Sequence, residues 1–69
     1  MTQKDRILEY MEDFGSITSR EAVIDLGVMR LASRINELIR EGVPITKTME
    51  ASPNRYGQVV RYARYRRAE

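Results

Sequence analysis

The spacing of apolar residues changes at Pro44, and this change restricts the possible folds more than any other feature of the sequence. Before Pro44, apolar residues recur every three or four positions, which is the spacing of one face of an α-helix. After Pro44 they alternate with polar residues, as in a half-buried β-strand. The chain has 69 residues, enough for one small core. We therefore expect one α+β domain, mainly α-helical, that covers residues 1–69.

Three helices are predicted in the first part of the chain. Thr18 and Glu21 have the spacing of a capping box, in which each side chain bonds the backbone of the other residue, so a helix begins there. Gly15 and Gly42 follow amphipathic stretches and suit the left-handed conformation that ends a helix. Residues 16–18 form a short extended connector between the first two helices. The predicted helices cover about residues 3–14, 19–26 and 29–41.

Two strands are predicted after Pro44. The second of them is rich in β-branched and aromatic residues, which favour strands. The loop between them contains Pro53, Asn54 and Gly57, which are residue types that favour turns. The strands cover about residues 44–50 and 58–66 and form a two-stranded hairpin.

The apolar faces of these elements define one predicted core. Tyr65 is expected to pack on the core or cover the sheet, rather than to contact a ligand. The side chains that we expect to be buried together are Ile7, Leu8, Met11, Phe14, Ile17, Val23, Leu26, Leu31, Ile35, Leu38 and Ile45.

The charge of the chain is unevenly distributed. Residues 1–27 carry three basic and six acidic side chains, a net charge of −3. Residues 28–69 carry nine basic and four acidic side chains, a net charge of +5. This separation favours a polyanionic partner for the C-terminal part of the chain. The alternative is ordinary surface charge that is segregated by chance.

Several classes of site are excluded by residue types that the chain lacks. It has no histidine and no cysteine, so zinc fingers, histidine acid–base catalysis and thiol nucleophiles are excluded. No serine has an evident base, and no glycine-rich phosphate loop is present, so we expect neither an enzyme nor a cofactor. Apolar runs of at most three residues are too short to span a membrane, and we expect a cytoplasmic protein.

Three segments mark the ends of the predicted helices: Gly15-Ser16-Ile17-Thr18, Leu26-Gly27-Val28 and Arg34-Ile35-x-x-Leu38-x-x-x-Gly42. Together with the order helix, short strand, helix, turn, helix and hairpin, they resemble the winged helix-turn-helix. The last segment and the basic hairpin look like the small winged-helix domains frequent in bacteriophage and prophage genomes. The resemblance covers nearly the whole chain. It implies binding to double-stranded DNA and regulation of transcription or of another DNA transaction.

The third helix is expected to enter the major groove. Arginine can bond guanine O6 and N7, and serine can reach a base or a phosphate. Glu37 has two possible roles: it accepts from a cytosine amine, or it holds Arg34, and we favour the second. The predicted DNA-contacting residues of this helix and its flanks are Met29, Arg30, Ser33, Arg34 and Arg40.

The hairpin is expected to act as a basic wing. Residues 54–67 include five arginines and no acidic residue. An arginine at the tip of such a wing can bond phosphates or enter a narrow minor groove. The predicted DNA-contacting residues of the wing are Asn54, Arg55, Tyr56, Arg61 and Arg64.

Other partners are also compatible with these residues. Alternating arginine and tyrosine on a strand can stack single-stranded RNA bases, but RNA-binding sheets usually have more strands than this chain can form. The main alternative is a protein-interaction module in which the acidic first helix or the hairpin edge binds a partner. Because the sequence has neither coiled-coil heptads nor a spare helix, we expect a monomer in solution that binds DNA alone or pairs only on DNA.

Overall fold

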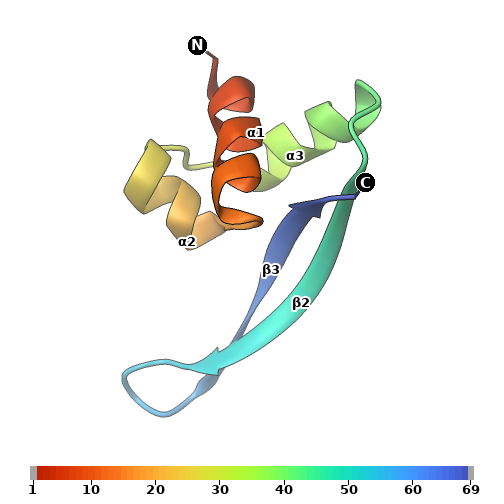
Figure 1. Ribbon diagram of the computed structural model, residues 1–69. Helices are drawn as coiled ribbons and strands as arrows, with labels where there is room; N and C mark the ends of the chain where they lie inside the picture. Colours follow the sequence, from red (N-terminus) through yellow and green to blue (C-terminus); the bar gives the residue numbers. More distant parts are fainter. Residues whose placement is uncertain (1, 69) are drawn as a thin grey trace.

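The computed structural model describes residues 2–68 and consists of a helical body from which a long hairpin projects (Figure 1). Helix α1 (Gln3–Phe14) begins at Thr2, whose hydroxyl accepts from the Asp5 N–H at 3.2 Å. The Asp5 carboxylate accepts in turn from the Thr2 N–H, which completes a capping box. Gly15 ends the helix at a φ of 85°, a left-handed conformation that glycine adopts without strain.

The second helix is irregular. Helix α2 (Ser19–Glu21) begins with the predicted capping box of Thr18 and Glu21, and it continues directly into a π-helical turn, η1 (Ala22–Leu26). The turn ends at Gly27, whose N–H bonds the Ala22 carbonyl five residues earlier. Helical residues therefore cover the predicted range 19–26, but the second half is wound more widely than an α-helix.

Helix α3 (Leu31–Arg40) begins two residues later than the predicted start at Met29. The side chain of Val28 is 1% exposed, and the segment of residues 27–30 that includes it is not helical. Arg30 is consequently the N-cap, with a φ of −122°, and Met29 precedes the helix. Glu41 caps the C-terminal end, so the predicted end at residue 41 is one residue beyond the last helical residue.

The sheet has three antiparallel strands rather than the two that were predicted. Strand β1 (Ile17–Thr18) pairs with β3 (Val59–Arg67), and β3 pairs with β2 (Ile45–Pro53), which gives the order β1-β3-β2. The extended connector predicted at residues 16–18 thus contains β1, the strand that was not predicted. The winged helix-turn-helix architecture is confirmed, with a larger sheet than a mainly α-helical fold implies.

The hairpin strands extend further than predicted. Residues 51–53 were assigned to the loop, but Ala51 pairs with Arg61 and Pro53 pairs with Val59. Proline has no N–H to donate to a neighbouring strand. Pro53 is tolerated in β2 because β2 is an edge strand, with no strand on its outer side. The loop is therefore short, and the ladder continues well beyond the helical body (Figure 1).

One core joins the helices to the base of the sheet. Leu8, Leu26 and Ile45, which were predicted to be in the core, are partly buried against it. The prediction that Tyr65 packs on the core is confirmed, since it is 8% exposed. The buried apolar residues of the core are Ile7, Tyr10, Met11, Ile17, Ala22, Val28, Leu31, Ile35, Leu38 and Tyr65.

Two predicted core residues are instead exposed. Phe14 is the last residue of α1 and is 70% exposed, whereas Tyr10, one turn earlier on the same side of the helix, is buried. Val23 is 39% exposed because the wide turn of η1 rotates it away from the buried side of that helix, where Ala22 lies.

Candidate nucleic-acid interface

The outer face of α3 carries a shallow depression lined entirely by polar side chains. The opposite face of the helix buries Leu31, Ile35 and Leu38, and this burial fixes the polar side chains toward solvent. Four of the predicted DNA-contacting residues thus share one surface. The residues that line the depression are Arg30, Ser33, Arg34, Asn36, Glu37 and Arg40.

Arg34 is held by neighbouring side chains. Its Nη1 donates to Glu37 Oε2 at 2.5 Å, and its Nε donates to Gln3 Oε1 at 3.1 Å. The Arg34 guanidinium holds the pKa of the Glu37 carboxyl below its usual value. Of the two roles considered for Glu37, the structure contains the pair with Arg34.

Arg30 and Arg40 have no such partners. Within residues 2–68, neither side chain forms an ion pair or a hydrogen bond. Arg30 lies just before the first turn of α3, and Met29 beside it is 77% exposed. A cationic side chain and an apolar side chain therefore lie together in solvent at the start of α3.

Arg64 forms the centre of a polar network at the base of the hairpin. Its Nε donates to Glu50 Oε1 at 2.8 Å on β2, and its Nη1 donates to Ser16 Oγ at 2.9 Å, just before β1. Glu21 of α2 lies 3.5 Å from the same Nη1. These contacts tie both neighbouring strands and α2 together, and the bond from Arg64 lowers the pKa of the Glu50 carboxyl.

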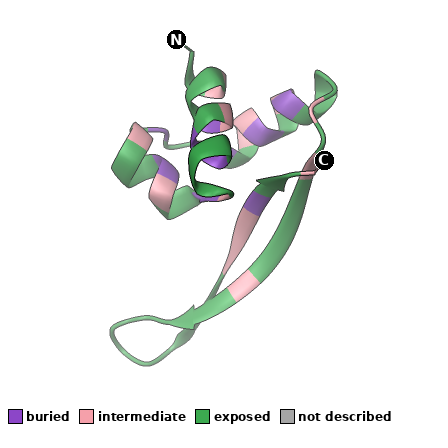
Figure 2. Ribbon diagram, in the orientation of Figure 1, coloured by how far each residue is buried: buried purple, intermediate pink, exposed green. Residues whose placement is uncertain are grey.

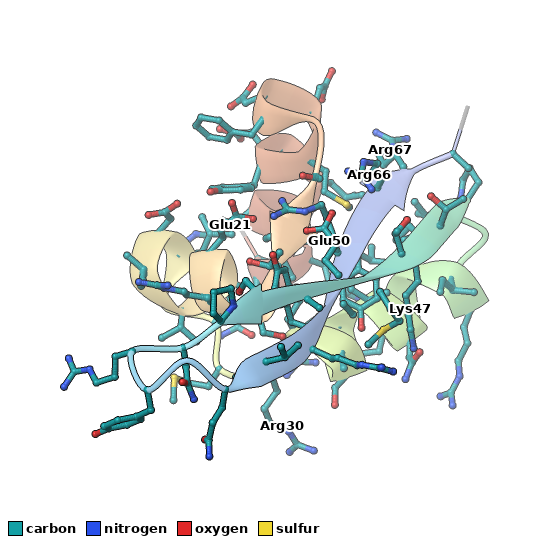
Figure 3. The ribbon with its side chains drawn as sticks, turned by 90° about the horizontal axis from the view of Figure 1, so that it is seen from below. Glu21, Arg30, Lys47, Glu50, Arg66 and Arg67 are labelled. Carbon is teal, nitrogen blue, oxygen red and sulfur yellow. The ribbon has the colours of Figure 1, made fainter. Side chains whose placement is uncertain are left out.

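Arg61 and Arg64 lie on opposite faces of β3. Side chains alternate along a strand, so Arg61 shares a face with the buried Tyr65, whereas Arg64 lies on the other face. Lys47 is paired with Tyr65 and lies on the Tyr65 face. In Figure 3, Lys47 and Arg30 lie on one side of the hairpin ribbon, and the carboxylates of Glu21 and Glu50 lie on the other.

The tip of the hairpin has a defined conformation although its side chains are exposed. The Asn54 side-chain oxygen accepts from the Tyr56 N–H at 2.9 Å and from the Gln58 N–H at 3.1 Å. Gly57 adopts a φ of 78°, which this turn requires. Asn54 thus holds the loop, and Arg55 and Tyr56 project from it, with Tyr56 78% exposed.

Two residues of this surface were missed by the sequence analysis. Asn36 lines the α3 depression, and its position one residue after the buried Ile35 was a usable signal. Lys47 lies on the Tyr65 face of β2, and the alternation of Ile45, Lys47 and Met49 placed it on the same face as the apolar residues. The prediction included neither residue because it relied on arginine side chains.

The arrangement of three helices, a three-stranded sheet and a basic hairpin can be compared with known families. The family model described as a winged helix-turn-helix domain matches residues 2–68. The chain belongs to this family. No curated protein and no solved structure shows a significant match to the winged helix-turn-helix chain.

Family membership indicates the general class of function. Winged helix-turn-helix domains are typically DNA-binding modules rather than enzymes, and membership therefore suggests that DNA is the partner. In the part of the chain that the structure describes, no helix is long and apolar enough to cross a membrane.

Proposed function

We propose that this domain binds double-stranded DNA with α3 in the major groove and the hairpin on the adjacent backbone or minor groove. Its role would be regulation of transcription or of another DNA transaction. The observation that carries the proposal is the position of the cations without ion-pair partners. Within residues 2–68, those on α3 and the hairpin are Arg30, Arg40, Lys47, Arg55, Arg61 and Arg67.

The α3 face has the chemistry needed to read base edges. Arg30 has a free guanidinium at the N-terminal end of the helix, and the N-terminal residues of a recognition helix contact bases in helix-turn-helix proteins. Ser33, about one turn further along, is small enough to allow close approach to a base or phosphate. Met29 offers an apolar contact for the thymine methyl group.

The arginines that have partners are assigned a different role. Arg34 has two of its guanidinium nitrogens bonded to Glu37 and Gln3, so it presents only the remaining donors to DNA. Arg64 is directed toward the carboxylates of Glu21 and Glu50, and we assign it to positioning the hairpin rather than to phosphate contact. Arg61, on the other face of the same strand, is the better candidate for the backbone.

The tip of the hairpin extends the interface beyond α3. Arg55 is exposed on a loop that Asn54 holds in one conformation, so the cation is presented with less loss of loop entropy. A contact from this position to phosphate or to the minor groove strengthens binding to every DNA sequence. Because the sequence has neither coiled-coil heptads nor a spare helix, we infer a monomer in solution that binds DNA alone or pairs only on DNA, which sedimentation can test.

The deciding experiment replaces Arg30. Fluorescence anisotropy with a preferred duplex should show a loss of about 1 to 3 kcal/mol for Arg30→Ala, because a bidentate contact to guanine is lost. Arg6→Ala is the matched control. Arg6 is also an exposed arginine, but it lies on α1 and does not line the α3 depression. Equal binding of the parent and the Arg30 variant, or no binding of duplex by the parent at low salt, would overturn the proposal.

A further inference from the structure

The acidic side chains of the domain fall into two groups. Glu21, Glu37, Glu41 and Glu50 each form an ion pair with a basic side chain. Within residues 2–68, Asp5, Glu9, Glu12, Asp13 and Asp25 form none, and all of them lie on α1 or η1. The negative charge that the fold does not neutralise is therefore concentrated on one part of the surface.

A groove between α1 and η1 combines three of these carboxylates with exposed apolar surface. Glu9 and Asp13 are four residues apart on α1, and Asp25 lies across from them on η1. Tyr10, Phe14 and Leu26 supply the apolar part of its lining. Phe14 is 70% exposed. This is unusual, because burial of so large an apolar side chain would stabilise a small core.

The floor of the groove is already ordered. The Tyr10 hydroxyl donates to Asp25 Oδ2 at 2.6 Å, which joins α1 to η1 across the groove. The rings of Tyr10 and Phe14 pack together with their centroids 4.6 Å apart. Binding here would therefore require little rearrangement of the domain.

We propose that this groove is a docking site for a basic, amphipathic segment of another protein. The aliphatic stem of an arginine or lysine can lie on the exposed Phe14 ring while its charged group approaches Asp13. An apolar side chain of the same segment fits against Tyr10 and Leu26. Arg6 also lines the groove, so the net charge of the lining is −2 rather than −3, which still favours a cationic partner.

The position of the groove allows the partner to bind together with DNA. The buried face of α3 packs toward α1, and Arg34 on the polar face bonds Gln3 at the start of α1. No residue that lines the groove also lines the α3 depression, so the two surfaces are separate. Figure 3 shows α1 and Arg30 on opposite sides of the molecule. The inference goes beyond the proposed DNA binding, because it concerns a second surface and a protein partner.

The test uses three short synthetic peptides and the whole domain labelled with ¹⁵N. The first peptide carries arginine and leucine at helical spacing, the second has serine in place of leucine, and the third has glutamate in place of arginine. The first peptide should shift the amide signals of Tyr10, Phe14 and Asp25 and bind more tightly than the other two. Equal affinity of the arginine peptides with leucine and with serine would overturn the proposal, because attraction would then depend on charge alone.

Adjacent acidic residues on α1 provide matched variants. Asp13→Asn should weaken binding of the first peptide about two- to fivefold, as for an exposed ion pair. Glu12→Gln removes the same charge one residue away, but Glu12 lies beside Gly15 and Arg67 instead of in the groove, and affinity should not change. Equal losses in both variants would contradict a specific site.

Phe14→Ser tests the apolar part of the site. It should weaken binding of the first peptide about tenfold, because the exposed ring supplies most of the apolar contact area. None of the groove variants should change affinity for duplex DNA, so failure of this proposal is distinguishable from failure of DNA binding. If the same amides shift when the domain alone is concentrated, the occupant is a second copy and the proposal of a separate partner is wrong.

Discussion

The two ends of the hairpin differ in how they are held. At its base, Tyr65 is 8% exposed within the core, and Arg64 bonds Ser16 and Glu50. Toward its tip, every residue from Ala51 to Arg61 is exposed (Figure 2), and the strands are joined mainly by their own ladder. Burial of side chains therefore stabilises the base, whereas the backbone hydrogen bonds and the Asn54 turn order the tip.

Because of this difference, the base of the hairpin determines folding stability, whereas the tip contributes to the proposed DNA binding. A change at the base removes contacts that the folded state needs, so it alters the free energy of unfolding. A change at the tip removes solvated charge, so it leaves folding nearly unaffected and alters attraction to a polyanion. Substitutions in the body, at the base and at the tip should therefore differ in which of the two quantities they change.

The largest effect is expected in the body. Leu38 is 2% exposed in the core, and Leu38→Ala should lower the free energy of unfolding by about 2 to 5 kcal/mol, because it leaves a cavity. Ile39, the next residue, is 48% exposed, and Ile39→Ala is the control with a much smaller loss. Urea melts followed by circular dichroism would measure both. Equal losses would mean that the burial of α3 is assigned to the wrong face.

The two arginines on β3 provide the sharpest comparison. Arg64→Ala should lower the free energy of unfolding by about 1 to 2 kcal/mol, because Glu50 loses the closer of its two arginine partners at the partly buried base. Arg61→Ala should leave stability unchanged and weaken DNA binding. Urea melts and anisotropy on the same two variants would decide. A stable Arg64 variant that binds DNA poorly would show that Arg64 contacts DNA after all.

The order of the elements could be predicted because it depends on short-range signals. Capping boxes at Thr2 and Thr18 and left-handed glycines such as Gly15 mark helix ends through contacts within a few residues. The outward position of Val23 could not be predicted, because the π-helical turn changes the spacing that assigns residues to a face. Phe14 was assigned to the core because its spacing is correct, but spacing does not show where the body ends.

The residue types of the candidate site could be predicted, but the side chains with which they pair inside the fold could not. Arg30 and Arg34 lie on the same side of a helical wheel, yet only Arg34 is bonded to Gln3, which is distant in sequence. Arg61 and Arg64 likewise differ because Arg64 meets Ser16 and Glu21 across the fold. Such pairings depend on tertiary packing, and this is why the sequence could not separate contact residues from positioning residues.

At the tip, the expected effect is on the salt dependence of binding. Arg55→Ala should weaken binding to all duplexes about five- to tenfold near 0.1 M salt and reduce the slope of log K against log salt by about 1, as one phosphate contact is lost. The stability of this variant should match that of the parent. Anisotropy over a salt series with two unrelated duplexes would measure this. A loss confined to one sequence would indicate base readout by the tip instead.

The smallest effect is expected from a tyrosine hydroxyl in the body, with Tyr56 at the tip as its control. The hydrogen bond that Tyr10 donates to Asp25 raises the pKa of Tyr10 to about 12. Because the folded state favours the protonated phenol, this contribution to stability is complete below pH 10 and is lost as the pH rises from 10 toward 12. Tyr10→Phe should therefore lower stability by about 0.5 to 1 kcal/mol at pH 7, and the difference from the parent should shrink above pH 10. Tyr56→Phe changes an exposed side chain, so its curve should follow that of the parent. Urea melts of the three proteins between pH 7 and 11 would test this, and a difference between the parent and Tyr10→Phe that does not vary with pH would show that the hydroxyl does not bond Asp25 in solution.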